Sequence, residues 1–260
     1  MDLGLEGRVA LVTGGSEGLG RATAAALAAE GASVAIVARG AERLEAAAAA
    51  IRAASPGARV LTLAADVSRA DVPTRIVDET AAELGGLDIV VNNAGTAAGL
   101  PFLDIDDETW AGDLDLKLMA AVRVTRAAVP HFRARGGGRV VNILAAAAKA
   151  PGAGSAPSAV SRAAGMALTK ALSKEYAAEQ ILVNAVLIGL VKSGQWERRH
   201  EAAGAGTLDE YYAQLAGAVP VGRVADAEEL ADLVVFLVSE RARYITGTAI
   251  NFDGGANPVV

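Results

Sequence analysis

The sequence contains no cysteine and only two histidines, His131 and His200. The absence of cysteine excludes disulfide bonds, thiolate nucleophiles and sulfur-ligated metal sites. A zinc site or a Ser-His-Asp triad would have to use one of the two histidines, which is a poor basis for either. We therefore expect no metal in this protein.

The chain also lacks a basic surplus and a long uncharged apolar segment. Its net charge is −6, so the sequence gives no sign of the positively charged surface that nucleic acid binding requires. No apolar run reaches the roughly 18 residues of a membrane span without charges, and no basic segment precedes the first apolar run, as it would in a signal peptide. We expect a cytoplasmic protein that binds a small-molecule substrate, with neither nucleic acid nor membrane as a partner.

Short β-branched segments alternate with longer alanine-rich segments along the chain. Nearly continuous apolar runs such as VAIVA are typical of parallel strands buried on both faces. The expected strands cover 8–12, 33–38, 59–63, 87–91, 138–144, 181–186 and 247–251. The expected helices cover 18–31, 40–54, 69–85, 106–134, 155–178 and 226–239. This alternation predicts an α/β fold with a doubly wound parallel sheet, in one domain over residues 1–260.

The segment 188–225 breaks this alternation. It follows the sixth expected strand and carries Trp196, His200, Tyr211 and Tyr212 among charged residues. Because long insertions near binding sites are often functional, we interpret 190–217 as a helical cap over a pocket. The alternative is a surface excursion that packs its aromatic side chains on the core.

The segment VALVTGGSEGLGRATAAAL combines a strand, a glycine turn and a helix. Gly14, Gly18 and Gly20 form the pattern TGxxxGxG. Glycines allow the tight turn and let the backbone approach a pyrophosphate, which the helix start then binds through its free N–H groups and dipole. The pattern at the first strand predicts a dinucleotide site. The same loop contributes Ser16, Glu17 and Leu19.

The end of the second expected strand bears on the choice of nucleotide. An acidic residue there would bind the ribose 2′-hydroxyl, but the sequence has Ala38 and Arg39. Arginine can bind a 2′-phosphate, so NADP(H) is favoured over NAD(H), although Glu17 would repel that phosphate. Alternatively, Arg39 is a solvated charge at a helix start. Asp66, after the third strand, is expected to accept a hydrogen bond from the adenine amine.

Further motifs accompany the glycine loop: Asp66-Val67, NNAG at 92–95, RVVNI, LVNAV and TGTAINFDGG. Together they make nearly the whole chain similar to the short-chain dehydrogenase/reductase family. The resemblance implies a seven-stranded Rossmann-like sheet, a nicotinamide cofactor, and oxidation of alcohols or reduction of carbonyls. It also implies a homo-oligomer, a dimer or homotetramer, built on 106–134 and 155–178. The other cofactor-binding positions that we expect are Val67, Asn93, Ala94, Gly95, Arg162, Ile188 and Ser193.

The chain departs from the family at the four positions of its Asn-Ser-Tyr-Lys active site. Aligning SAVSRAA with the family's YxxxK places Ser158 at the tyrosine and Arg162 at the lysine, while Ala145 stands at the serine and Lys117 at the asparagine. In the family the tyrosine gives a proton to the carbonyl oxygen, and the lysine lowers its pKa. The serine binds the same oxygen, and the asparagine orders a water.

We expect Lys117, Ser158 and Arg162 to form an altered catalytic site. A serine hydroxyl donates hydrogen bonds but is a far weaker acid than a phenol, whose pKa is about 10. Burial beside Arg162 would lower the pKa of Lys117 and let it act as acid or base. Alternatively, Lys117 lies on the helix surface or pairs with Asp113 or Asp115. Further candidates for substrate contact or proton donation are Ser155, Trp196, His200, Tyr211 and Tyr212.

Three functions are open at this point. The first is an atypical oxidoreductase that binds NADP(H) and acts on a small carbonyl or hydroxyl substrate, for which an anion would suit the two cations. The second is a non-redox lyase or hydrolase of a dicarbonyl-type substrate. The third is a non-catalytic NADP(H)-binding protein. We rank the oxidoreductase first because the phosphate loop is intact.

Overall fold

Seven parallel strands form the centre of the protein in a computed structural model, which describes residues 2–204 and 206–260. The strands are β1 (Val9–Thr13), β2 (Ser33–Ala38), β3 (Val60–Ala64), β4 (Ile89–Asn92), β5 (Gly138–Ala145), β6 (Ile181–Ile188) and β7 (Ala249–Phe252). Their order in the sheet is β3-β2-β1-β4-β5-β6-β7. The predicted doubly wound parallel sheet is confirmed. Its order reverses beside β1, which opens a crevice at the carboxyl ends of the strands.

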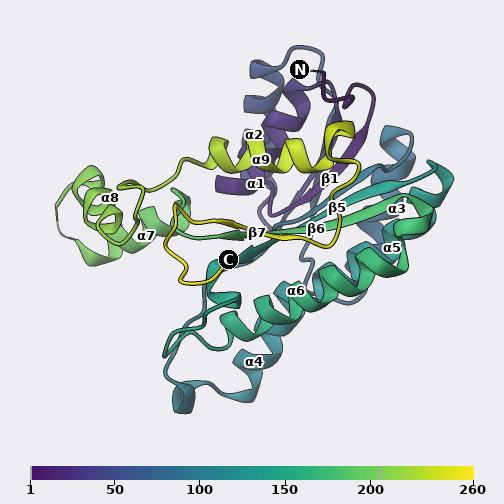
Figure 1. Ribbon diagram of the computed structural model, residues 1–260. Helices are drawn as coiled ribbons and strands as arrows, with labels where there is room; N and C mark the ends of the chain where they lie inside the picture. Colours follow the sequence, from purple (N-terminus) through teal and green to yellow (C-terminus); the bar gives the residue numbers. More distant parts are fainter. Residues whose placement is uncertain (1, 205) are drawn as a thin grey trace.

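Helices cover both faces of this sheet (Figure 1). One face packs against α1 (Gly18–Ala29), α2 (Ala41–Ala54) and α9 (Ala227–Val238). The other face packs against α3 (Val72–Leu84), α5 (Ala120–Ala134) and α6 (Ser158–Glu175). Neighbouring strand residues therefore enter different cores: Leu11 and Val12 are both fully buried, on opposite faces. This double burial explains the continuous apolar runs in the sequence.

The single helix expected over 106–134 is interrupted. It consists of α4 (Asp107–Leu114), a π-helical turn (Asp115–Met119) and α5. Asp106 starts α4 because its side chain accepts a 2.8 Å hydrogen bond from the Thr109 N–H. A π turn holds an extra residue, so it rotates the side chains that follow, and such turns are frequent at functional sites. Here the turn contains Lys117, which is buried.

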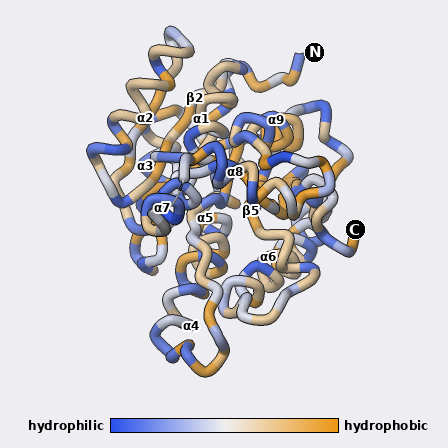
Figure 2. The backbone as a smooth tube through the Cα atoms, turned by 90° about the vertical axis from the view of Figure 1, so that its left-hand side faces the viewer, coloured by the Kyte–Doolittle hydropathy of each residue, from blue (hydrophilic) through white to orange (hydrophobic). Residues whose placement is uncertain are grey.

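The segment after β6 forms two helices, α7 (Gly194–Ala203) and α8 (Leu208–Ala216), which extend beyond one end of the sheet (Figure 1). Figure 2 shows α7 as predominantly hydrophilic. A helix with so little apolar surface does not belong to a core. No helix within residues 2–204 and 206–260 is both long and apolar enough to cross a membrane.

Candidate functional site

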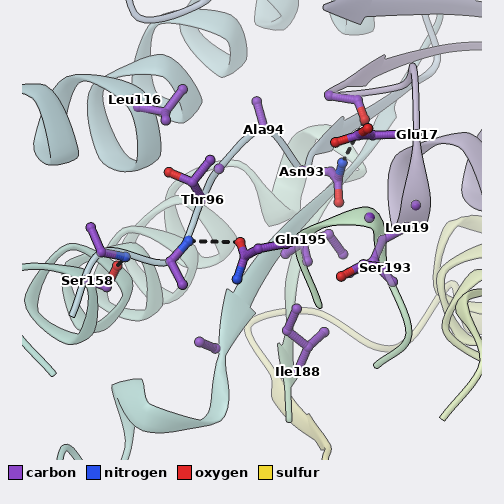
Figure 3. A pocket seen from close by; sticks show the side chains of 18 of the residues that line it. Glu17, Leu19, Asn93, Ala94, Thr96, Leu116, Ser158, Ile188, Ser193 and Gln195 are labelled. Carbon is purple, nitrogen blue, oxygen red and sulfur yellow. Dashed lines mark hydrogen bonds between the residues drawn. The ribbon is translucent and has the colours of Figure 1, made fainter. Parts of the chain in front are cut away.

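A cavity of about 550 Å³ lies at the carboxyl ends of the strands, where the strand order reverses. Figure 3 shows part of its wall. The expected site residues in this wall are Gly14, Ser16, Glu17, Gly18, Leu19, Arg39, Asp66, Val67, Asn93, Ala94, Gly95, Ala145, Ser155, Ser158, Arg162, Ile188, Ser193 and Trp196. Gly20, Lys117, His200, Tyr211 and Tyr212 are not among the residues that line it.

The glycine loop is shaped by backbone conformation and by close approach. Gly14 and Gly18 have φ values of +69° and +52°, in the left-handed region that favours glycine. Gly20 lies behind the loop, where an added Cβ would collide with the Gly14 carbonyl oxygen and lie 2.5 Å from Nδ2 of Asn93. That Nδ2 donates hydrogen bonds of 3.0 and 3.3 Å to the carbonyl oxygens of Thr13 and Gly14. The loop therefore fits a pyrophosphate that needs close backbone approach.

Two arginines, Arg39 and Arg43, line the cavity just beyond the end of β2. Oδ1 of Asp66 accepts hydrogen bonds from the N–H and the hydroxyl of Ser68, at 3.0 and 2.7 Å. Partial burial raises the pKa of Asp66, but these hydrogen bonds and the nearby Arg39 outweigh it, so the net pKa lies below its usual value. An ionised Asp66 can accept a hydrogen bond from an adenine amine. Sequence reasoning missed Arg43, which lies four residues after Arg39 in the first turn of α2.

Glu17 does not present a free charge to the cavity. Its carboxylate is bound by Arg198 of α7 through two hydrogen bonds, of 2.9 and 3.2 Å, and Arg43 lies 3.6 Å away. The hydrogen bond from Arg198 is the main reason that the pKa of Glu17 lies below its usual value. The repulsion that we expected between Glu17 and a 2′-phosphate is therefore offset by two cations.

Lys117 lies behind the cavity wall and reaches it only through another side chain. Its ammonium donates hydrogen bonds to the hydroxyl of Ser158 and to the carboxylate of Asp113. Its side chain is 1% exposed. Burial lowers the pKa of Lys117, Asp113 opposes this effect, and the nearby Arg162 adds to it. Lys117 is therefore paired with Asp113, one of the two placements weighed for it, and is linked to the cavity lining through Ser158.

Ser158 is the part of this cluster that faces the cavity. It is the first residue of α6, which begins later than expected, so that Ser155 lies in the preceding loop. The Ser158 hydroxyl oxygen accepts a 3.0 Å hydrogen bond from the backbone N–H of Ala98 as well as the one from Lys117. Two accepted hydrogen bonds occupy both lone pairs of the oxygen. The hydroxyl itself donates a long hydrogen bond, of 3.5 Å, to Oδ1 of Asp113. An acceptor that binds closer in the cavity would take this proton in place of Asp113.

Arg162 follows Ser158 by one turn of α6. Its Nη1 donates a 2.6 Å hydrogen bond to the Ile143 carbonyl oxygen of β5. Its Nη2 lies so close to Gly95 that an added Cβ there would be 2.5 Å away. Burial lowers the pKa of Arg162 to about 10, so the guanidinium stays charged at neutral pH. A fixed cation at this place suits ribose hydroxyls.

Of the described residues in the region expected to cap the pocket, those that line the cavity lie between 191 and 199, in the segment before α7 and in α7 up to Arg199. Trp196 lines the cavity, and the Arg199 guanidinium stacks 4.7 Å above its ring. The rings of His200 and Tyr211 instead face each other, with centroids 5.4 Å apart, and Tyr211 contacts Tyr212. The His200–Tyr211 contact joins α7 to α8, and the Lys192 ammonium lies 5.8 Å from the centre of the Tyr212 ring. Gln195, which sequence reasoning missed, lines the cavity and accepts a 3.1 Å hydrogen bond from the Ala97 N–H (Figure 3).

Comparison with known proteins agrees with this geometry. A family model described as enoyl-(acyl carrier protein) reductase matches residues 14–257. The chain is 31% identical over 256 residues to the 3-oxoacyl-(acyl-carrier-protein) reductase FabG of Escherichia coli (strain K12), with 97% of this chain and 98% of that protein covered.

Two solved structures are similar over almost their whole length. The first is L-sorbose reductase from Gluconobacter frateurii complexed with NADPH and L-sorbose, with a TM-score of 0.96, 38% identity and 100% of both chains covered. The second is an NADPH-bound short chain oxidoreductase from Pseudomonas aeruginosa PAO1 that contains an atypical catalytic center. It has a TM-score of 0.91 and 36% identity, and covers 97% of this chain and 98% of its own.

Proposed function

Because the chain belongs to the short-chain dehydrogenase/reductase family, we propose that it is an NADP(H)-dependent oxidoreductase that reduces a small carbonyl compound at an altered active site. The similar reductase from Gluconobacter frateurii was solved with NADPH and a ketose. The similar oxidoreductase from Pseudomonas aeruginosa holds NADPH beside an atypical catalytic center. Both relatives support NADP(H) as the cofactor, and the second supports its use with an atypical catalytic center.

The wall of the cavity fits NADP(H) from end to end. The glycine loop would receive the pyrophosphate, Arg39 and Arg43 the 2′-phosphate, and Asp66 the adenine amine. Arg162 would bind the nicotinamide ribose, and the backbone at Ile188 and the hydroxyl of Ser193 would lie near the carboxamide. When bound in its reduced form, this cofactor supplies a hydride to the carbonyl carbon.

The contact between Lys117 and Ser158 is the observation that carries the proposal. A carbonyl oxygen that gains negative charge needs a proton. A close carbonyl oxygen in the cavity would take the Ser158 hydroxyl proton from its long, 3.5 Å hydrogen bond to Asp113. As that proton leaves, the Lys117 ammonium gives one of its own to the serine oxygen. The reaction then leaves an alcohol product, a neutral serine and a neutral lysine, which recovers its proton from solvent.

The same contacts count against a hydrolase with Ser158 as nucleophile. A nucleophilic serine needs a free lone pair on its oxygen and a well-placed base that accepts its proton, whereas Asp113 accepts from Ser158 only at 3.5 Å. The Ser158 oxygen accepts hydrogen bonds from Lys117 and from Ala98, and Asp113 favours the charged form of Lys117. This arrangement suits a proton donor.

Calorimetric titration with NADPH and with NADH tests the cofactor, and NADPH oxidation tests the reaction. L-sorbose is the first substrate to try, because a similar reductase was crystallised with it. Other ketoses and 3-oxoacyl thioesters complete the set. We expect tighter binding of NADPH and oxidation of NADPH by at least one carbonyl compound. Turnover that needs no nucleotide would instead support a non-redox enzyme, and absence of binding to either nucleotide would refute the proposal.

Arg39→Asp should reverse the preference for nucleotide. The carboxylate would repel a 2′-phosphate and accept a hydrogen bond from a 2′-hydroxyl, so the affinity for NADPH should fall by about tenfold or more while NADH binds more tightly. Arg243→Asp makes the same charge change at an exposed position that does not line the cavity and serves as the control. If the ratio of NADPH to NADH affinity is unchanged in Arg39→Asp, Arg39 does not bind the 2′-phosphate.

A further inference from the structure

Asp113 is a buried carboxylate whose place in the site is not explained by cofactor binding or by contact with a substrate. Its side chain is 3% exposed, and it does not line the cavity. It accepts hydrogen bonds from the Lys117 ammonium and, at 2.6 Å, from the hydroxyl of Ser161. The Ser158 hydroxyl also donates a long hydrogen bond, of 3.5 Å, to Oδ1 of Asp113. A buried carboxylate is costly unless charge and hydrogen bonds compensate it, so its position between Lys117 and α6 calls for an explanation.

We propose that Asp113 is a positioning residue for proton transfer, which holds the Lys117 ammonium against Ser158 and keeps it protonated near neutral pH. This inference rests on the proposed function. Asp113 does not line the cavity and contacts both Lys117 and Ser158 behind its wall, so it acts on the reaction through the position and charge of Lys117.

The arrangement of the backbone supports this role. Asp113 and Lys117 lie four residues apart across the junction of α4 with the π turn, and their side chains form an ion pair. Ser161 and Ser158 both belong to the first turn of α6. The hydrogen bond from the Ser161 hydroxyl fixes the Asp113 carboxylate. The fixed carboxylate in turn orients the Lys117 ammonium toward Ser158, which faces the cavity.

Two charged groups face the Lys117 ammonium from the elements packed around it: Asp113 of α4 and Arg162 of α6. The other carboxylate of this segment, Asp115, is half-exposed and pairs with Arg123 at 2.9 Å. Burial and Arg162 both lower the pKa of Lys117, and Asp113 alone opposes them. An opposite charge in contact typically shifts a pKa by about 1–3 units. Loss of the Asp113 charge would therefore lower the pKa of Lys117 further, so that the lysine loses its proton at a lower pH.

Asp113→Asn tests the inference, because asparagine keeps the shape of the side chain and a carbonyl oxygen for Ser161. The charge of Lys117 is followed by NMR in protein with isotope-labelled lysine, saturated with NADP⁺, and its signal is assigned with Lys117→Met. We expect the titration midpoint of Lys117 to fall by about 1 pH unit or more. Reduction needs the charged lysine, so the rate falls as pH rises through this midpoint, and the falling limb of the kcat profile should shift by the same amount.

Asp115→Asn is the matched control, since it removes a carboxylate two positions away that points to Arg123. It should leave both the midpoint and the kcat profile unchanged. If Asp113→Asn lowers only the melting temperature and leaves midpoint and profile in place, Asp113 is structural and the inference is overturned. Lys117→Met separates this failure from that of the proposed function: an unchanged reduction rate in that variant would reject the proton route through Lys117 itself.

Discussion

Ser158→Ala should lower kcat for carbonyl reduction by about 10²–10⁴-fold, the usual contribution of a positioned proton donor. The substitution removes the hydroxyl group that connects Lys117 with the cavity, and alanine has no proton to give. Affinity for NADPH should stay near the wild-type value, because the phosphate and adenosine contacts lie elsewhere in the cavity. The measurement is single-turnover oxidation of bound NADPH, together with calorimetry.

Ser173→Ala provides the control for this prediction. Ser173 lies on the same helix, is buried, and donates its hydroxyl hydrogen bond to the Lys170 carbonyl oxygen, away from the cavity. Ser173→Ala should leave the rate of NADPH oxidation close to the wild-type rate. Equal losses in the two variants would mean that the Ser158 effect comes from helix packing, and an unchanged rate in Ser158→Ala would exclude Ser158 as the donor.

Gly20→Ala should abolish NADPH binding at concentrations that saturate the wild-type protein. Gly20 is in α1, where alanine is the better helix former, so the helix itself should not suffer. The added methyl group would collide with the Gly14 carbonyl oxygen and press on the Asn93 amide. Both atoms belong to the connection between the glycine loop and the end of β4, so the loop would have to move out of the shape that fits a pyrophosphate.

The control for Gly20→Ala is the same substitution at Gly112 of α4. An added Cβ at Gly112 meets no atom within 4 Å, and Gly→Ala in a helix typically stabilises by about 1 kcal/mol. Gly112→Ala should bind NADPH normally and melt no earlier than wild type. A folded Gly20→Ala protein with wild-type affinity would show that the glycine loop does not hold the nucleotide.

The strands and the nucleotide loop could be predicted because their physical causes are local. Strands such as β2 are buried on both faces, so their sequence is apolar at nearly every position. The glycine loop needs left-handed backbone at Gly14 and Gly18, and this need is visible in the residue type. Seven strands and the order of helices between them follow from signals of this kind.

The chemistry of Lys117 could be predicted only in part. The spacing of four residues suggests its pairing with Asp113, but pairing and access to the site looked like alternatives. They coexist because the π turn and the start of α6 bring Ser158 to the same ammonium, and no periodic pattern signals a π turn. The role of Asp113 therefore became visible only in three dimensions.

The cap region was the least predictable part. Its aromatic residues suggested contact with a ligand, yet the packing of α7 on α8 leaves only Trp196 of them at the cavity. The residues of α7 that contact the opposite wall of the cavity are polar. Gln195 binds the loop after β4, and Arg198 binds Glu17 of the glycine loop. Glu17 and Arg198 are 181 positions apart in the sequence, a separation at which pairing cannot be inferred from one sequence.

The central claim is that this protein passes a hydride from NADPH to a carbonyl carbon although serine stands at the position of the family's tyrosine. The most direct test incubates the wild-type protein with NADPH deuterated at the transferring position and with the panel of ketoses and 3-oxoacyl thioesters. We expect deuterium at the carbinol carbon of the alcohol product and a slower turnover than with unlabelled NADPH. Bound NADPH that transfers no deuterium to any of these compounds, or a product formed without the label, would contradict the account.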